Sequence, residues 1–410
     1  MGLNVSLNKV SLDKYSRIVG ERETEEIRSL AKRIEKKRFC HVNSTSFGGG
    51  VAEILHRLVP LMKDVGLDAE WKVITGSDKF FNVTKTFHNA LLGLESSLTK
   101  EMKNVYLRQN EMNSNLLDLN YDYVIIHDPQ PLALINYCHE KIGKWVWRCH
   151  IDLSQPNREF LDFLIPYITL YDASIFSLER YAKKFAKIKE IAVIHPSIDP
   201  LSDKNKPLSD SKVLSTLETY DVAPDRPILT QVSRFDPWKD PMGVIDVYRL
   251  VKRRIPSVQL LLIGSMAHDD PEGLVYYEKT DRYAGNDYNI HLLTNLADVK
   301  VNALQRASDV VLQKSIREGF GLTVSEALWK EVPVVGGNAG GITLQILDGK
   351  TGFLVNNVEE AAQKTLHLLK HPKKAQQMGR KGRQHVLKNF LITRHLKSYF
   401  KLFLQLSEKG

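Results

Sequence analysis

The sequence predicts an α/β protein built from two doubly wound parallel sheets. Short apolar runs alternate with helical segments in both halves of the chain, and a polar stretch near the middle interrupts the alternation. The length of 410 residues suits two domains of ordinary size. We expect the two sheets to face each other across a deep cleft, with ligands at the carboxyl ends of their strands.

The first domain, residues 1–200, is predicted from six strand-like runs. These runs are 39–42, 71–74, 124–126, 145–147, 173–176 and 191–194. A glycine loop follows the first run and opens a helix, whose apolar residues recur at helical spacing: Val51, Ile54, Leu55, Leu58 and Met62. Gly66 is the expected end of that helix. Strands and helices in alternation indicate a parallel sheet.

A polar stretch at 201–226 is rich in Lys, Asp, Ser and Pro and is predicted to link the domains. The second domain, residues 227–389, repeats the alternation. Its strand-like runs are 228–232, 260–263, 290–292, 310–313 and 332–335. The end of the chain is typical of two amphipathic, basic helices. We expect the last helix, at 390–410, to cross back to the first domain.

Composition excludes several classes of protein. A chain that is 43% hydrophobic and 26% charged is typical of a soluble globular protein. No apolar run approaches the roughly 20 residues that a membrane span needs. Residues 1–38 lack the apolar core of a signal peptide, so we expect a cytoplasmic location and no membrane partner. Cys40, Cys138 and Cys149 fit neither a disulfide framework nor a metal site.

The net charge of +9 does not predict nucleic-acid binding. The basic residues are scattered, and the densest clusters, at 32–38 and 370–383, are typical of solvated helix faces. The sequence has no Gly-x-Ser-x-Gly elbow, no His-Glu-x-x-His helix and no Walker A loop. It has no Asp-x-Asp pair either, so we expect no metal-held diphosphate.

Two glutamates, Glu318 and Glu326, bracket a glycine loop between a predicted strand and a predicted helix start. Carboxylates at such a position would accept hydrogen bonds from the hydroxyls of a ribose or a hexose. A structural alternative stays open. Thr323 and Glu326 have the spacing of a capping box, and Glu318 fits an ordinary loop acid.

Two cations and another glycine loop follow other strands of the second half. Arg234 and Lys239 lie five residues apart across a Pro-containing turn. The planar guanidinium of Arg234 and the mobile ammonium group of Lys239 would together bind a diphosphate. The alternative is a pair of ordinary surface cations. The loop at 336–343 would aim backbone amides at a phosphate or a sugar, with a purely structural turn as its alternative.

The first half offers similar loops. Gly49 and Gly50 open the helix after the first strand and would let the backbone approach an anion, or simply form a tight turn. Polar residues follow two later strands, at 127–130 and 148–152, and would face the cleft. Among them, His150 would hydrogen-bond a sugar hydroxyl or a developing charge, unless it is a structural histidine.

In this order, the elements resemble the retaining, metal-independent glycosyltransferases with two Rossmann-like domains, the GT-B type. The family includes sucrose and glycogen synthase-like enzymes. The resemblance rests on the N-terminal glycine loop, the Arg234 and Lys239 pair, two glutamates with seven residues between them, and the Gly-Gly-Ile loop. It spans nearly the whole chain. Segments 42–53, 127–131 and 147–152 are similar to those of the trehalose-forming members.

The resemblance implies a role for each candidate residue. Glu318 would bind hydroxyls of the transferred glucose, and Glu326 those of the ribose. The catalytic residues that it implies are Arg234, Lys239, Glu318 and His150. The donor-binding residues that it implies are Gly49, Gly50, Arg234, Lys239, Glu318, Glu326, Gly341, Ile342 and Thr343. The acceptor-binding residues that it implies are Ser44, Thr45, Asp128, Gln130 and Arg148.

The activity that the resemblance implies is reversible transfer of glucose from a nucleoside diphosphate glucose to free glucose, which gives α,α-trehalose. The first domain would take the acceptor and the second the donor, with no metal or other cofactor. A homodimer is the assembly that we expect. Four alternatives stay open: a transferase for a sucrose-, glycogen- or mannosyl-type acceptor, a trehalose phosphorylase, a nucleotide-sugar epimerase and a non-catalytic nucleotide-sugar sensor.

Overall fold

The computed structural model describes residues 4–47, 49–138, 142–183, 185, 188–264 and 271–408. The chain divides into two compact units. Unit 1 comprises Met1–Pro196 and Ile392–Gly410, and unit 2 comprises Ser197–Leu391. The chain therefore leaves unit 1, builds unit 2 and returns to unit 1 with its last helix, as the sequence predicts.

Unit 1 contains a six-stranded sheet in the order β2-β1-β3-β4-β5-β6, and every pairing in it is parallel. The strands are β1 (Arg38–Asn43), β2 (Asp68–Val73), β3 (Tyr123–His127), β4 (Lys144–Cys149), β5 (Ala173–Phe176) and β6 (Ile191–Val193). Each of the six predicted runs overlaps one of these strands. The helices are η1 (Leu12–Tyr15), α1 (Ser16–Val19), α2 (Glu21–Lys32), α3 (Gly49–Asp64), α4 (Asp78–Leu91), α5 (Lys100–Leu116), η2 (Leu132–Asn136), α6 (Arg158–Ile168), α7 (Glu179–Ala182) and α16 (Ile392–Glu408).

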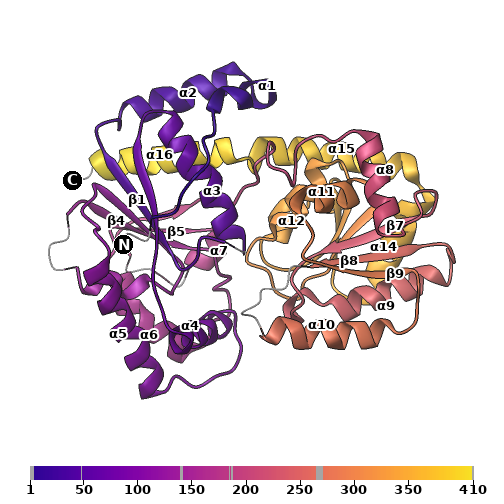
Figure 1. Cartoon of the computed structure of the whole chain (residues 1–410), viewed down its shortest axis with the longest axis horizontal. Helices are drawn as coiled ribbons and strands as arrows, with labels where there is room; N and C mark the ends of the chain where they lie inside the picture. Colours follow the sequence, from indigo (N-terminus) through magenta and orange to yellow (C-terminus); the bar gives the residue numbers. More distant parts are fainter. Residues whose placement is uncertain are drawn as a thin grey trace. The chain divides into compact units, whose positions relative to one another are not determined.

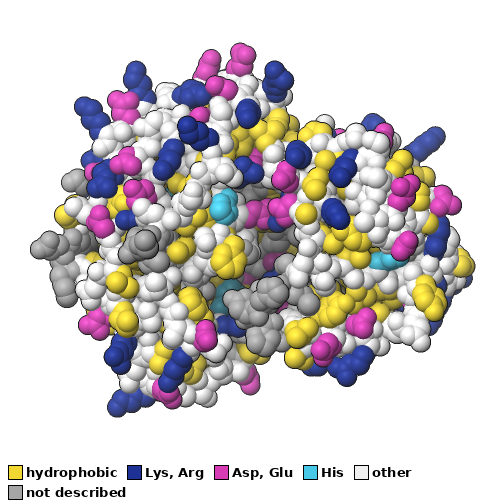
Figure 2. Space-filling view, in the orientation of Figure 1, with side chains coloured by type: hydrophobic (Ala, Val, Ile, Leu, Met, Phe, Trp, Pro, Cys, Tyr) yellow, Lys and Arg dark blue, Asp and Glu magenta, His cyan; other side chains and the backbone are white. Residues whose placement is uncertain are grey.

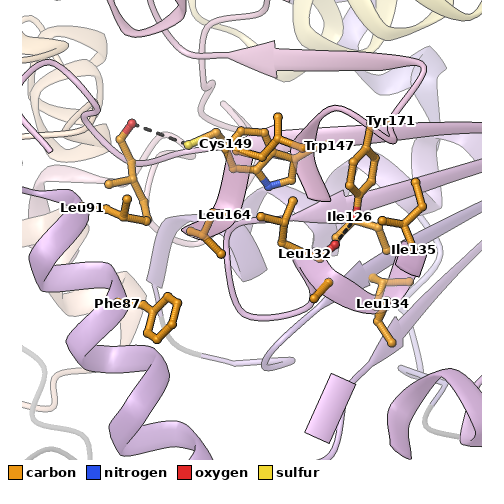
Figure 3. Close-up of a cluster of buried hydrophobic side chains, with 14 of the residues drawn as sticks. Phe87, Leu91, Ile126, Leu132, Leu134, Ile135, Trp147, Cys149, Leu164 and Tyr171 are labelled. Carbon is orange, nitrogen blue, oxygen red and sulfur yellow. Dashed lines mark hydrogen bonds between the residues drawn. The ribbon is translucent and has the colours of Figure 1, made fainter. Parts of the chain in front are cut away.

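Helices cover both faces of this sheet (Figure 1), and the alternation of side chains along each strand decides what faces which helix. In β4, Trp145 and Trp147 join the apolar core under α4, α5 and α6. Figure 3 shows part of this core, where the Tyr171 hydroxyl donates to the Leu132 carbonyl at 2.7 Å. On the opposite face, the Phe39 ring packs against Phe403 of α16 at 5.0 Å.

Unit 2 contains a second six-stranded parallel sheet, in the order β12-β11-β10-β7-β8-β9. Its strands are β7 (Ile228–Val232), β8 (Gln259–Gly264), β9 (Ile290–Thr294), β10 (Val310–Gln313), β11 (Val334–Gly337) and β12 (Gly352–Val355). Its helices are α8 (Asp210–Thr219), η3 (Pro237–Lys239), α9 (Pro241–Lys252), α10 (Pro271–Ala284), α11 (Asp298–Arg306), α12 (Leu322–Trp329), α13 (Ile342–Gln345), α14 (Val358–Lys370) and α15 (Pro372–Asn389).

Strand β8 shows why both units are doubly wound. Leu260 and Leu262 belong to one apolar core, whereas Leu261 and Ile263 belong to the core on the opposite face. A strand with consecutive apolar side chains has to be covered on both sides, which requires helices on both faces. The two units are therefore Rossmann-like, as the sequence predicts.

Two features of unit 2 differ from the expectation. Residues 201–226, expected as a linker, lie within unit 2, where Leu217 of α8 is buried in the core that includes β7, β8 and α11. Strand β12 is absent from the prediction. It is a short edge strand that begins with Gly352, beside Val334 of β11.

In the part of the chain that the structure describes, no helix is both long enough and apolar enough to cross a membrane. Lys and Arg side chains lie intermixed with Asp and Glu over the face shown in Figure 2. This distribution agrees with the scattered basic residues of the sequence.

Candidate active site

The loop after β7 is held in shape by its own polar side chains. Asp236 precedes the short helix η3, and its carboxylate accepts a hydrogen bond from the Lys239 amide at 3.0 Å. Gln231 at the end of β7 donates to the Lys239 carbonyl at 2.7 Å. Arg234 contacts Asp236 at 3.3 Å, yet its side chain is 56% exposed. Both predicted cations therefore sit on an ordered loop, and the Arg234 guanidinium is accessible to a ligand.

Lys239 and Glu318 form an ion pair with an Nζ to Oε2 distance of 2.5 Å. Their side chains are only 16% and 9% exposed. Ser315 donates a further hydrogen bond to the same carboxylate oxygen at 3.3 Å. Removing one partner from a buried pair costs about 3–5 kcal/mol, because the other charge loses its counterion. The structure thus brings together a cation and a carboxylate that lie 79 residues apart in the sequence.

Glu326 is 2% exposed and lies on α12, one turn after the left-handed Gly321 that precedes the helix. No side-chain hydrogen bond caps this helix. Thr323 instead directs its hydroxyl to the side-chain oxygen of Gln313, at 3.2 Å. The start of α12 therefore does not contain the capping box that is the alternative for Thr323 and Glu326. Whether Glu326 meets a ribose stays a prediction.

The loop with Gly340 and Gly341 packs closely on the backbone that carries Glu318. A Cβ on Gly340 would lie 1.4 Å from the Glu318 carbonyl oxygen, and one on Gly341 would lie 2.5 Å from the Phe320 Cα. Gln345 of α13 joins the two loops, since its amide donates to the Phe320 carbonyl at 2.5 Å and to the Gly341 carbonyl at 3.3 Å. Glycine is required here because any side chain would separate the loops.

We expect Gly340→Ala to destabilise the protein by about 3 kcal/mol, because the added methyl group would overlap backbone. The matched control is Gly349→Ala. Gly349 also has a positive φ, of 68°, but a Cβ there would meet nothing within 4 Å. That variant should lose only the strain of a left-handed alanine, about 1–2 kcal/mol. Thermal unfolding of both variants measures the difference, and equal losses would contradict the close packing of the two loops.

In unit 1, the glycine loop lies partly outside the described residues, since Gly48 is not among them. Helix α3 begins at Gly49, which has a φ of 75°, and both Gly49 and Gly50 are exposed. Ser44 and Thr45 are partly buried before it, and the Thr45 hydroxyl donates to the Phe47 carbonyl at 3.0 Å. The glycine backbone is open to an approaching ligand.

Asp128 follows β3 in a left-handed conformation, with a φ of 61°. Its carboxylate accepts from the His150 amide at 2.8 Å, and its carbonyl accepts from the Trp147 indole at 3.1 Å. Burial raises the pKa of the Asp128 carboxyl to about 7. Gln130, two residues on, is partly exposed, and its carbonyl accepts a hydrogen bond from Asn110. Asp128 therefore has a structural role in tying the ends of β3 and β4 together.

Arg148 does not lie where the sequence analysis expects it. Its side chain has no exposed surface, and its guanidinium donates to the Ile194 carbonyl at 2.8 Å inside unit 1. The physical reason is the pleat of β4, which points Arg148 to the face opposite Trp147. The expected direct contact between Arg148 and the acceptor sugar does not hold for a fully buried guanidinium.

His150 lies one residue past β4 and is partly exposed. Its Nε2 lies 3.1 Å from Nδ1 of His127, whose Nε2 lies 2.9 Å from Nδ1 of His41. Burial lowers the pKa of His150 well below the usual value. His150 is a candidate residue of the sequence and His127 belongs to the predicted segment 127–130, but neither their contact nor His41 is predicted. The available signal was one histidine inside β1 and another at the end of β3.

The structure positions Ile342 and Thr343 at the start of α13, beside the two glycines. Ile342 is buried, and the Thr343 hydroxyl donates to the Gly340 carbonyl at 2.9 Å. Among the described residues, no group of three or more His, Cys, Asp or Glu side chains could hold a metal ion. Independence from metals stays a prediction.

Comparisons with known proteins match both units. Residues 41–183 match the family described as "Trehalose synthase, N-terminal domain", and residues 218–385 match "Glycosyl transferases group 1". Trehalose synthase of Thermococcus litoralis is 58% identical over 396 residues, which cover 95% of this chain and 96% of the relative. Trehalose synthase of Rubrobacter xylanophilus is 49% identical over 405 residues, which cover 97% of each chain. Trehalose phosphorylase of Pleurotus pulmonarius is 30% identical over 395 residues, but these cover only 54% of that protein.

Two solved structures share the fold. "Trehalose-6-phosphate from E. coli bound with UDP-2-fluoro glucose" has a TM-score of 0.74 at 16% identity, and covers 90% of this chain and 99% of its own. Sucrose-phosphate synthase from Thermosynechococcus elongatus has a TM-score of 0.72 at 16% identity, and covers 91% of this chain and 100% of its own. Given the two Rossmann-like units and relatives at 58% and 49% identity over nearly the whole chain, the protein belongs to the trehalose synthase family and is a hexosyltransferase of the GT-B fold.

Proposed function

We propose that this protein transfers glucose from a nucleoside diphosphate glucose to the anomeric hydroxyl of free glucose, forming α,α-trehalose, and that the reaction is reversible. The observation that carries the proposal is the contact between Lys239 and Glu318, backed by the Gly340 and Gly341 loop. A cation beside a carboxylate suits a ligand that joins a diphosphate to a hexose. The trehalose synthases that resemble this chain over most of its length support the choice of product.

Lys239 and Arg234 would hold the diphosphate of the donor. Lys239 is held in place by its ion pair with Glu318 at 2.5 Å, and the exposed guanidinium of Arg234 offers planar donors to a second phosphate oxygen. Glu318 would then bind the hexose, and Glu326 the ribose. Amides of Gly341, Ile342 and Thr343, together with the open backbone of Gly49 and Gly50, would complete the donor contacts.

The mechanism follows from where charge develops. As the bond between the sugar C1 and the phosphate oxygen breaks, the sugar becomes oxocarbenium-like and negative charge collects on the departing diphosphate. Fixed cations stabilise this charge more in the transition state than in the bound donor, and that difference accelerates the reaction. The acceptor hydroxyl attacks from the same face, so the configuration is retained. Its proton passes to the leaving phosphate oxygen.

The acceptor glucose would lie against unit 1, near Ser44, Thr45 and Gln130. Asp128 is 8% exposed, so only its edge is available to a sugar. His150 would contact the transferring sugar through the side of its ring that is not hydrogen-bonded to His127. We propose that no metal takes part, since Arg234 and Lys239 supply positive charge at the diphosphate.

The test is to incubate the protein with free glucose and, in separate reactions, UDP-, ADP- and GDP-glucose, and to identify the disaccharide. We expect α,α-trehalose and the free nucleoside diphosphate with at least one donor, at a rate that chelation of divalent metals leaves unchanged. Reactions that lack glucose or contain other sugars as acceptors serve as controls. A disaccharide other than trehalose, or turnover of the donor without any acceptor, would contradict the proposal.

A trehalose phosphorylase is the second candidate, because a protein of that name is 30% identical over 84% of this chain. Incubating trehalose with inorganic phosphate in one reaction and with UDP, ADP or GDP in another separates the two. Release of a nucleoside diphosphate glucose supports the proposed transferase. Release of glucose 1-phosphate would replace it with the phosphorylase.

A further inference from the structure

Three histidines in unit 1 form a hydrogen-bonded chain across the sheet. His41 is in β1, His127 ends β3 and His150 follows β4, and these three strands are neighbours in the sheet. The bonds are 2.9 Å between His41 Nδ1 and His127 Nε2, and 3.1 Å between His127 Nδ1 and His150 Nε2. His41 is fully buried and His150 is partly exposed, so the chain runs from the interior of unit 1 to its surface.

The three rings are neutral near pH 7. Burial lowers the pKa of His41 to about 3 and the pKa of His127 well below its usual value, and the charge of Arg148 depresses the pKa of His127 and His150 further. A neutral imidazole has one N–H and one lone pair. His127 therefore donates through one nitrogen and accepts through the other. Both bonds of the chain must run in the same direction.

The surroundings of His41 select the direction. Its Nε2 is buried and, within the described ranges, has no hydrogen-bond partner; the same is true of the Tyr399 hydroxyl and of Nε and Nη1 of Arg148. The Tyr399 ring lies 5.9 Å from the His41 ring. His395 donates through Nδ1 to a carbonyl, so its Nε2 carries a lone pair.

The unpartnered buried groups around His41 and Tyr399 include Nε and Nη1 of Arg148, which can only donate. The Tyr399 hydroxyl can donate or accept, and His395 Nε2 offers a lone pair. A chain running inward would add another unpartnered N–H, at His41 Nε2. A chain running outward instead leaves a bare lone pair at His41 Nε2, which can accept from these donors. Unpaired buried N–H groups are rarer than under-satisfied acceptors, so the outward direction is favoured.

We propose that His41 and His127 are positioning residues that fix His150 in the tautomer with its proton on Nδ1, so that His150 offers an N–H donor to an oxygen of the transferring sugar. This inference rests on the proposed function for the identity of the sugar. It also excludes one role for His150, that of the base which accepts a proton. A nitrogen that carries a proton has no lone pair, so His150 does not take the proton of the acceptor hydroxyl, which leaves that task to the departing phosphate.

The tautomers can be measured directly on the full-length protein without substrate. Ring-nitrogen NMR of isotope-labelled histidine distinguishes N–H from bare nitrogen at each position, and single variants assign the three residues. We expect Nδ1–H for His41, His127 and His150 alike. An Nε2–H tautomer or a charged ring at any of the three would overturn the proposal. The spectrum is independent of turnover, so a protein with this pattern that makes no trehalose would refute the function and leave the chain intact.

A pair of substitutions at His41 tests positioning. The amide nitrogen of an asparagine occupies the place of imidazole Nδ1, so His41→Asn retains a donor to His127, whereas His41→Leu does not. We expect His41→Leu to lower kcat by about 5- to 10-fold, the value of one hydrogen bond, with little change in KM for the donor. His41→Asn should restore most of that loss. The unfolding temperatures of the two variants should be equal, so that stability does not affect the comparison. Equal kcat values for His41→Asn and His41→Leu would then contradict a role for the His41 proton.

Discussion

Lys239→Ala should lower kcat/KM by about 30- to 1000-fold, the loss expected when one donor that stabilises developing charge is removed, about 2–4 kcal/mol of transition-state stabilisation. Two effects combine in this variant. The diphosphate loses a cation, and Glu318, only 9% exposed, loses the counterion at 2.5 Å. Donor binding should weaken together with the rate, because the lysine contacts the diphosphate in the bound state as well.

The matched control for this change is Lys252→Ala. Lys252 forms an ion pair with Asp287 at 2.7 Å in the same unit, but its side chain is 33% exposed and it lies on α9, apart from the loops described above. Its removal should leave kcat/KM within about twofold, since exposed pairs contribute little. An unchanged rate in Lys239→Ala, with folding intact, would remove Lys239 from the active site.

Glu318→Gln should lower kcat about 100-fold while the dissociation constant of the donor changes by less than about threefold. The amide keeps the shape of the side chain but loses the negative charge. That charge orients Lys239 and, in our account, holds hydroxyls of a sugar that becomes positively charged in the transition state. An interaction that strengthens only in the transition state affects kcat and not binding.

Steady-state kinetics and calorimetric titration of the donor separate these two quantities. Glu331→Gln is the control, because Glu331 makes the same kind of ion pair, with Arg383 at 3.3 Å, on a more exposed part of unit 2. Full activity in Glu318→Gln would show that this carboxylate does not contact the sugar. Loss of donor binding in parallel with the rate would assign it to the diphosphate region instead.

Sequence patterns were sufficient for most of the fold, because parallel strands buried on both faces are continuous apolar runs. They failed at β12, which begins with Gly352. Glycine is required at that position by the neighbouring strand, because a Cβ there would lie 2.5 Å from the Val334 carbonyl oxygen. They also failed at 201–226. The polar composition there hides Leu217, the residue that anchors α8 to the core. Burial of a few side chains in a polar segment leaves little trace in the sequence.

Spacing along the chain identifies the candidate residues of unit 2 well. Glu318 and Lys239 each follow a strand, and the carboxyl ends of neighbouring parallel strands, here β10 and β7, meet at one edge of the sheet. Arg148 shows the converse. Its place near a strand end predicts exposure, but the alternation along β4 directs it into the protein. The hydrogen-bonded chain from His150 through His127 to His41 escapes prediction because a contact across three strands depends on register, which only the folded sheet defines.

The central claim is that Arg234 and Lys239 bind the donor diphosphate while Glu318 binds the hexose. A crystal structure of the protein with UDP and glucose, or with an intact nucleoside diphosphate glucose, tests it most directly. We expect Lys239 Nζ and the Arg234 guanidinium within hydrogen-bonding distance of phosphate oxygens, and the Glu318 carboxylate on sugar hydroxyls. A diphosphate bound elsewhere, with Arg234 and Lys239 directed into solvent, would contradict the account.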